Sequence, residues 1–272
     1  MQPLSLRVRR SYLFVLMFLF ILILPIVIFY ADGYRYKPGI GFRQTGGIFI
    51  SVPYSGAEVF FNGKVIGRSS FLDHSFYIDN LTAGTYTVLV EREGSIPWIR
   101  ALYVEPQLVT DARVLLVPVR ANVIRLITVA SVATSTRTIS VADLVAIRGQ
   151  FGESATTTVG LSGESLVIEN GNVYDRITQV TTLPASNFCR QPSYCVREIP
   201  IEISEDESNA AAFFHGGVVY STKESGVFFA EADIRPSPAT TNVYPRRGAE
   251  FRIVGESLIV KDGNSFYEII GL

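Results

Sequence analysis

The chain has 272 residues and a formal net charge of −1, and 48 % of its residues are hydrophobic. Without Arg7, Arg9 and Arg10 the remainder holds 21 basic against 25 acidic residues, a charge that argues against nucleic acid as a partner. Its 22 glycines, 13 prolines and frequent β-branched and aromatic residues are typical of short strands joined by tight turns. We therefore expect an all-β protein with two domains beyond an N-terminal segment.

Residues 11–31 (SYLFVLMFLFILILPIVIFYA) contain no formal charge. A helix of this length extends about 31 Å, enough to cross a hydrocarbon core roughly 30 Å thick. The run is too long for a cleavable signal peptide, and its exit at Tyr30-Ala31-Asp32 lacks the small-x-small cleavage pattern. A buried core helix of this length would show a polar stripe. We therefore predict one retained transmembrane helix at 11–31, with Pro25 tolerated inside it.

The flanking charges predict the orientation of this span. Three arginines and no acid lie in residues 1–10, which form a cytoplasmic tail by the positive-inside rule, and the first charge after the span is Asp32. The predicted location is therefore a cell membrane crossed once, with the bulk of the chain extracytoplasmic. The lipid bilayer is the expected partner of residues 11–31.

Residues 32–45 are rich in glycine and polar residues, and we expect them to form a short linker. Short apolar runs with strand character then follow between turn signals, and Asn62-Gly63 is a strong hairpin signal because both residues tolerate positive φ. The runs predict strands at 46–52, 57–62, 64–67, 76–81, 85–93, 98–106 and 112–119. Seven short strands over residues 46–118 predict a small antiparallel β-sandwich.

Twelve residues in this region carry a more specific pattern of proline, glycine and aromatic positions: Pro53, Gly56, Ala57, Asn62, Gly63, Lys64, Gly67, Gly84, Tyr86, Gly94, Pro97 and Trp98. In this order they resemble the PEGA domain, a small β-sandwich module of prokaryotic surface and envelope proteins. One extra residue between Pro53 and Gly56, and Ser69-Ser70-Phe71 in place of Thr-Pro, depart from the family pattern. The resemblance covers about a quarter of the chain and implies structural roles, with the five glycines in turns.

Trp98 has two interpretations at this stage. Packing in or beside the sandwich core is favoured, and an exposed platform for sugar stacking is the alternative.

Residues 119–272 are expected to form a second all-β domain. Ser140 and Asp143 predict a short helix with a capped N-terminus. Residues 163–177 (GESLVIENGNVYDRI) and 255–269 (GESLIVKDGNSFYEI) form a repeat, and a hairpin of similar kind starts at Gly217. The spacing is close to that of β-propeller blades, but 154 residues are short for a closed ring. A partial propeller and a second sandwich both remain open.

Cys189 and Cys195 are the only cysteines, and five residues separate them. In a region placed outside the reducing cytosol we expect a local disulfide. A metal site would need more ligands, since His74 and His215 are distant in sequence.

The sequence contains no Walker loop, dinucleotide fingerprint, nucleophile elbow or zinc-protease motif, and we predict no catalytic residue, cofactor or metal. The acidic run Glu202, Glu205, Asp206 and Glu207 lacks calcium-loop spacing, so a solvated loop is favoured. We expect a binding or scaffold protein of a prokaryotic envelope whose partners are envelope proteins or cell-wall polysaccharide. The alternatives are a carbohydrate binder that stacks sugars on exposed aromatics such as Trp98 or Tyr244, and, less favoured, an extracytoplasmic glycoside hydrolase.

Overall fold

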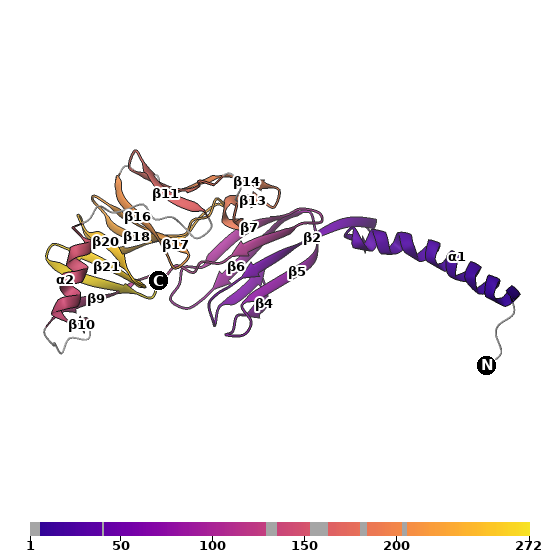
Figure 1. Ribbon diagram of the computed structural model, residues 1–272, viewed down its shortest axis with the longest axis horizontal. Coiled ribbons are helices and arrows are strands. Elements are labelled where there is room, and N and C mark those ends of the chain that lie inside the picture. Colours follow the sequence, from indigo (N-terminus) through magenta and orange to yellow (C-terminus); the bar gives the residue numbers. More distant parts are fainter. Residues whose placement is uncertain (1–5, 40, 129–134, 153–162, 180–183, 203–205) are drawn as a thin grey trace.

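The computed structural model describes residues 6–39, 41–128, 135–152, 163–179, 184–202 and 206–272. A long helix, α1 (Leu6–Ala31), projects from one end of the molecule, and two β units follow it in a row (Figure 1). Strands dominate the rest of the described chain, so the prediction of an all-β protein with one apolar N-terminal helix is confirmed.

Along most of its apolar length the helix α1 is not covered by the described part of the chain, and at its C-terminal end Phe29 and Tyr30 contact Tyr34 and Arg35. Every side chain from Val8 to Ala31 is exposed, and Pro25 lies inside the helix. A core helix of a globular protein would bury one face. The segment Val8–Ala31 is long and apolar enough to cross a membrane.

Residues 32–45, predicted as a short linker, contain strand structure. Strand β1 (Tyr34–Lys37) pairs antiparallel with the first residues of β2 (Gly41–Ser51), and β2 then continues into the sandwich. The glycines and Pro38 that indicated a spacer instead form the tip of this hairpin and the entry to β2, where Gly39 and Gly41 have positive φ.

The first β unit is a sandwich of two four-stranded sheets. One sheet has the order β1-β2-β5 with β8 pairing parallel to β2, and the other has the order β4-β3-β6-β7. The remaining strands are β3 (Glu58–Phe61), β4 (Lys64–Arg68), β5 (Ser75–Thr82), β6 (Gly84–Glu91), β7 (Trp98–Val104) and β8 (Val109–Arg113). Alternate residues of β2, β6 and β7 face a shared core that includes Ile48, Ile50, Val88, Val90 and Leu102.

The five glycines of the PEGA-like pattern were expected in turns, and three of them lie there. Gly56, Gly63 and Gly94 lie in turns with positive φ, and Gly84 also has positive φ but is the first residue of β6. Gly67 is different, because it lies inside β4 and has an ordinary φ. A Cβ atom there would lie 2.6 Å from the Phe76 ring, so close packing rather than turn geometry requires this glycine.

The predicted seventh strand at 112–119 is wrong in its bounds. Strand β8 ends at Arg113, and residues 114–117 continue as buried chain outside the sheet. Val114 and Leu116 pack in the sandwich core, whereas Leu115 and Val117 pack in the core of the second β unit. An alternating apolar run thus predicts one strand, but its two faces belong to two different cores.

The second β unit contains three packed sheets and a small hairpin. The first sheet holds β11 (Glu164–Glu169), β12 (Asn172–Ile177) and β15 (Glu198–Glu202); the second holds β16 (Ser208–Phe214), β17 (Gly217–Thr222), β18 (Gly226–Ala230) and β19 (Thr240–Tyr244). The third has the order β10-β9-β22-β21-β20, from β9 (Asn122–Ile127), β10 (Thr136–Thr138), β20 (Glu250–Val254), β21 (Ser257–Asp262) and β22 (Ser265–Ile270). A short 3-10 helix, η1 (Ser186–Phe188), leads into the small hairpin of β13 (Cys189–Gln191) and β14 (Tyr194–Cys195).

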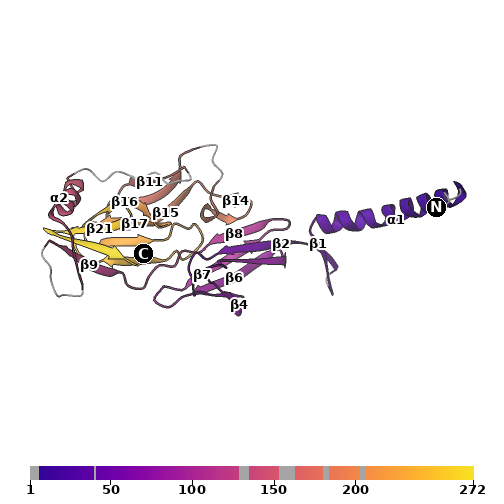
Figure 2. The same cartoon turned by 60° about the horizontal axis from the view of Figure 1, so that its bottom comes forward.

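The sheet β16–β19 is the middle layer of this unit. Val219, Val227 and Phe229 face the third sheet, whereas Val218 and Tyr220 face the first. Strand β17 is buried at every position, which explains its continuous run GVVYST. Helix α2 (Val141–Gln150) covers the outer face of the third sheet, and the Ser140 side chain accepts a hydrogen bond from the Asp143 backbone N–H, as the sequence predicts (Figure 2).

The repeated sequence forms hairpins in both places, with a difference of one residue. The first repeat turns at Asn170-Gly171, both with positive φ, between the paired residues Glu169 and Asn172. In the second, Asp262 pairs with Ser265, so the turn is Gly263-Asn264 rather than Asp262-Gly263, the two positions that align with Asn170-Gly171 in the repeat. The Asp262 carboxylate accepts a hydrogen bond from the Tyr244 hydroxyl at 2.9 Å.

Candidate functional site

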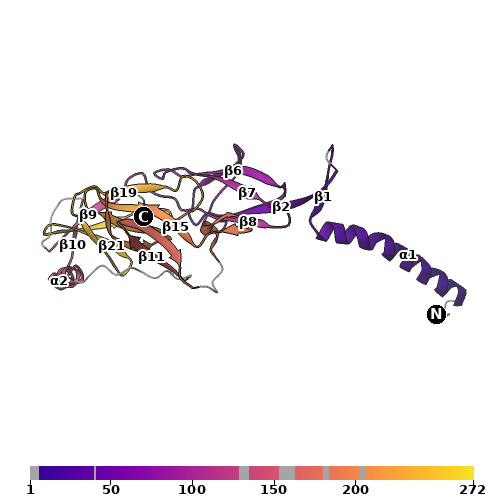
Figure 3. The same cartoon turned by 90° about the horizontal axis from the view of Figure 1, so that it is seen from above.

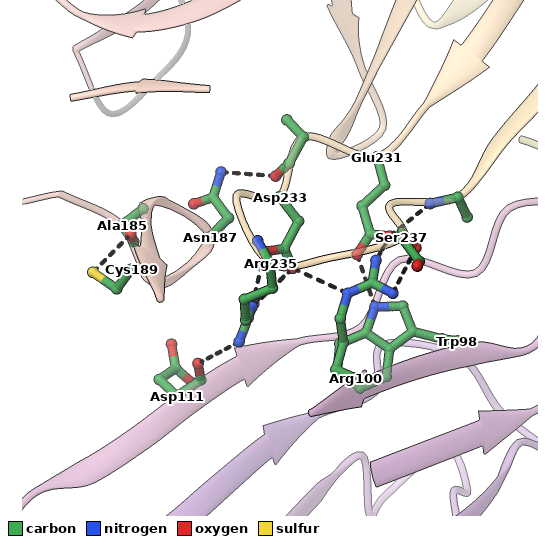
Figure 4. A network of polar contacts seen from close by, with 12 residues as sticks. Trp98, Arg100, Asp111, Ala185, Asn187, Cys189, Glu231, Asp233, Arg235 and Ser237 are labelled. Carbon is green, nitrogen blue, oxygen red and sulfur yellow. Dashed lines mark hydrogen bonds and ion pairs between the residues drawn. The ribbon is translucent and has the colours of Figure 1, made fainter. Parts of the chain in front are cut away.

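A cluster of four buried charges joins the sandwich to the second β unit (Figure 4). Arg100 belongs to β7, whereas Glu231, Asp233 and Arg235 belong to the segment between β18 and β19. Each of the four is at most 4 % exposed. Two positive and two negative side chains therefore lie together away from water, and burial of this kind requires pairing.

Arg100 and Glu231 form the centre of this charge cluster. Arg100 Nη2 is paired with Glu231 Oε2, and Trp98 Nε1 donates a hydrogen bond of 2.7 Å to Glu231 Oε1. The backbone N–H of Ala239 donates to the same carboxylate at 3.2 Å. Arg100 Nη1 donates to the carbonyl of Ser237 at 2.9 Å, so this one side chain contacts both ends of the segment between β18 and β19.

Asp233 and Arg235 form the second pair of the cluster. Arg235 Nε and Nη2 each donate to Asp233 at 2.8 Å, a bidentate arrangement that fits the planar guanidinium. Arg235 Nη1 donates at 3.4 Å to the carbonyl of Asp111 on β8. Arg100 Nε lies 3.6 Å from Asp233 Oδ2, so the two pairs touch.

The electrostatics of the cluster favour a fixed joint over proton transfer. Burial raises the pKa of the Glu231 carboxyl, while the Arg100 guanidinium and the Trp98 N–H act in the opposite direction. The carboxylate oxygens of Glu231 and Asp233 already accept hydrogen bonds from protein groups. The arrangement can hold the two β units together, and it offers no exposed group to a substrate.

A second buried acid, Asp175 on β12, has no such partners. Its side chain is 1 % exposed, and neither carboxyl oxygen has a hydrogen-bond partner within the described ranges. Burial, and secondarily the charge of Glu164, raise the pKa of Asp175 to about 7. Burial also raises the pKa of Glu164, and the charge of Arg113 opposes it.

The PEGA-like residues lie where a structural role requires them. Ala57 and Trp98 are buried, Asn62 and Gly63 form the turn between β3 and β4, and the Tyr86 hydroxyl donates to the carbonyl of Thr82 at 2.8 Å. Lys64 begins β4, whereas Pro53 and Pro97 lie outside the strands.

The favoured prediction that Trp98 packs in the sandwich core is confirmed, and the alternative of an exposed stacking surface at Trp98 or Tyr244 is wrong. Trp98 is 1 % exposed, and its ring lies 5.1 Å from the Arg100 guanidinium. Tyr244 is buried between the second and third sheets. Both rings fill cores, where most large aromatic surface in a protein lies.

Cys189 and Cys195 are joined by a disulfide. They lie opposite each other on β13 and β14 with their Cα atoms 3.9 Å apart. The bond closes the small hairpin beside η1.

The acidic run near residue 206 does not gather around a common point. Glu202 accepts a hydrogen bond from the Tyr220 hydroxyl at 2.8 Å, Asp206 accepts from the backbone N–H of Ser225, and Glu207 is paired with Lys223. Glu205 lies outside the described residues. Across the described ranges, no group of three histidine, cysteine or acidic side chains could hold a metal ion.

An open groove on the sandwich carries mixed charge. Its lining includes Glu58, Glu91, Glu93, Arg68 and Arg92, and its volume is about 370 Å³. Three acids and two bases line it, so it does not gather side chains of a single charge.

Sequence reasoning missed Arg100 and Asp175, although each leaves a signal. Arg100 occupies an inward position of β7, between Trp98 and Leu102, and Asp175 occupies an inward position of β12, between Val173 and Ile177. A charge on the apolar face of an alternating strand predicts a buried ion. Its partner cannot be found this way, since Glu231 lies 131 residues from Arg100.

No protein-family model matches the chain, and no curated protein matches it either. The resemblance to the PEGA domain therefore stays a prediction.

Proposed function

We propose that this protein is a single-pass, membrane-anchored scaffold that displays two joined β units on the extracytoplasmic side of a prokaryotic cell envelope and binds other envelope components there. The PEGA-like sandwich is the membrane-proximal part. The second unit is an incomplete propeller of three blade-like sheets, and it presents the distal surface.

The observation that carries this proposal is the bare apolar surface of α1. The segment Val8–Ala31 has a mean hydropathy of 3.1, and the described residues bury none of its most apolar part, so lipid is the natural cover. The disulfide favours an oxidising compartment beyond the cytoplasm. The arginines before the span favour a cytoplasmic N-terminus.

The buried joint between the two units supports a scaffold role. The charge cluster and residues 114–117 tie the sandwich to the second unit through both polar and apolar contacts. A joint of this kind holds the second unit in a fixed position relative to the membrane-proximal sandwich, whereas a flexible tether does not.

Alkaline carbonate extraction of membranes and protease treatment of intact cells test the anchor together. The chain is expected to stay in the membrane pellet, and protease is expected to remove nearly all of it from the cell surface. Free-thiol labelling without reductant is expected to be near zero at Cys189 and Cys195. A chain released by carbonate, or one fully protected from protease with both thiols reactive, contradicts the proposal.

A second candidate function is carbohydrate binding on the outer face of the sheet β2-β5-β8. Phe49 and Tyr77 are paired across β2 and β5 on this face, and both are exposed. Retention on isolated wall polysaccharide is expected to be lost in Tyr77→Ala and kept in Tyr194→Ala, an equally exposed tyrosine on β14. Equal retention of both variants contradicts binding at this face.

The neighbouring acids Glu164 and Asp175 give no support to the hydrolase alternative. Glu164 and Asp175 interact, but Asp175 is buried and cannot reach a glycosidic bond.

A further inference from the structure

The hairpin of β1 and β2 presents two aromatic rings to the outside. Tyr36 and Phe42 are directly paired across the hairpin with ring centroids 5.4 Å apart, and they are 66 % and 69 % exposed. Side chains alternate between the faces of a strand, so Arg35 and its partner Arg43 lie on the opposite face. The hairpin is therefore amphipathic, although nothing in the described chain covers its aromatic face.

Contacts at the root of the hairpin show which way each face points. On the arginine face, Arg35 Nε donates a hydrogen bond of 2.9 Å to Asn80 Oδ1 on β5, so this face is turned toward the sandwich. On the aromatic face, the Tyr34 ring meets the Phe29 ring of α1 edge-on with centroids 5.4 Å apart. Side chains of a helix tilt toward its N-terminus, so the Phe29 ring points back along the span. The aromatic face therefore adjoins the span through Tyr34, whereas the arginine face contacts both the sandwich and the last turn of α1 at Tyr30.

The hairpin is held at this angle by bonds to the helix end. Arg35 Nη1 donates to the carbonyl of Tyr30 at 2.8 Å, and the guanidinium lies 3.7 Å from the centre of the Tyr30 ring. Gln107 Nε2 donates to the carbonyl of Asp32 at 3.0 Å, which ties the same corner to the sandwich. In Figure 3 the hairpin projects sideways from the C-terminal end of α1 instead of continuing its axis.

We propose that the β1–β2 hairpin lies on the outer surface of the bilayer that α1 crosses, with Tyr36 and Phe42 inserted into the headgroup layer. This inference rests on the proposed membrane anchor and adds a second contact with the same membrane. Aromatic rings favour the boundary between headgroups and acyl chains, because one part of that environment is apolar and the other is wet.

Two contacts with one membrane have a mechanical consequence. A single helix leaves the displayed units free to tilt and rotate about the exit point, whereas a hairpin lying flat beside that point restricts both motions. The sandwich and the joined second unit are then held at a defined angle above the lipid.

Tryptophan fluorescence in vesicles tests the hairpin contact. The full chain is reconstituted in phosphatidylcholine vesicles, with and without phosphatidylcholine brominated near the carbonyl end of its acyl chains. Phe42→Trp places a reporter on the aromatic face, and Leu72→Trp is the matched control, because Leu72 is 90 % exposed on a loop at the other end of the sandwich. The native Trp98 is buried and gives the same background in both variants.

The emission added by Phe42→Trp is expected to be blue-shifted, and brominated lipid is expected to quench it several-fold more than the emission added by Leu72→Trp. Equal quenching of the two, in vesicles that retain the chain after an alkaline wash, overturns the hairpin contact and leaves the anchor standing. Loss of the chain from washed vesicles overturns both. Circular dichroism of each variant, compared with that of the unsubstituted chain, verifies the fold.

Discussion

The charge cluster around Arg100 and the lone carboxyl of Asp175 bury acids in two different ways. Glu231 and Asp233 lose their water but gain two guanidinium groups, an indole N–H and backbone donors. Asp175 loses its water and gains no hydrogen-bond donor from the described residues. Pairing with Arg100 and Trp98 opposes the effect of burial on the pKa of Glu231, whereas burial and the charge of Glu164 together raise the pKa of Asp175 to about 7.

This difference separates two roles for a buried acid. The paired acids lie between the two β units, where removing one partner strands a charge and loosens the joint. Asp175 lies within one unit, on the inward face of β12. The free-energy cost of burying its carboxyl depends on pH rather than on a charged partner. Four substitutions test this contrast.

Arg100→Ala is expected to have the largest effect. It leaves Glu231 buried without its cation, which costs about 3–5 kcal/mol in comparable buried pairs. Urea unfolding of the full chain in detergent, followed by circular dichroism, measures the loss. Arg247→Ala is the matched control, because Arg247 pairs with Glu224 at an exposed site and is expected to cost about 0–1 kcal/mol. Equal losses in the two variants contradict the contrast between buried and exposed pairs.

Asp175→Asn is expected to change how stability depends on pH. The folded pKa of Asp175, about 7, lies above the ordinary 3.8, so its folded state binds the proton more tightly than the unfolded state. The wild-type contribution is therefore fully present below pH 3.8 and is lost as pH rises through about 7, at roughly 1.4 kcal/mol per pH unit.

Asparagine cannot ionise, so the variant is expected to be more stable than wild type at pH 8 by a few kcal/mol, on the order implied by that slope. Unfolding curves at a series of pH values from about 4 to about 8 give the slope directly. Asp111→Asn, at an exposed position of β8, is the control and is expected to leave the slope unchanged. A wild-type slope retained in Asp175→Asn contradicts this account.

Trp98→Phe is expected to have an intermediate effect. The ring keeps most of its packing, but Glu231 loses the N–H donor that favours its charged form. The expected cost is about 1–3 kcal/mol. Because the lost bond acts on the charged carboxylate and raises its pKa further, the deficit relative to wild type should be larger at about pH 8 than at about pH 5. A deficit that is the same at both pH values contradicts a role through Glu231.

Glu164→Gln is expected to have the smallest effect. The charge of Glu164 raises the pKa of Asp175 but is second to burial. Its removal should therefore lower the pKa of Asp175 and move the pH range in which stability falls to lower pH, without abolishing the dependence of stability on pH. The same pH series measures the shift. No shift would mean that the two acids do not interact.

Much of the fold could be predicted from the sequence, because its signals are local. The uncharged run of α1, the Asn62-Gly63 turn, the cap at Ser140 and most strands of the sandwich depend on residues close together in the chain. The repeat located both hairpins, but not the one-residue difference between their turns at Asn170 and Gly263. That difference is one of strand-pairing register, and two similar sequences can pair in different registers.

The candidate site depended on contacts that are distant along the chain. An inward Arg100 signals a buried ion, yet only the packing of β7 against the segment after β18 shows that Glu231 is its partner. Likewise, residues 114–117 look like one more strand in the sequence, whereas in the structure their alternating faces pack in two separate cores.

The sequence by itself determined that this chain carries one apolar helix followed by strands, because the periodicities of helices and strands are patterns of side chains close together in the chain. Only the tertiary structure decided that the supposed linker is an amphipathic hairpin, that Trp98 is buried against Glu231, and that Asp175 has no donor among the described residues. These outcomes depend on which surfaces meet, and burial is a property of the assembled chain rather than of any short stretch of it.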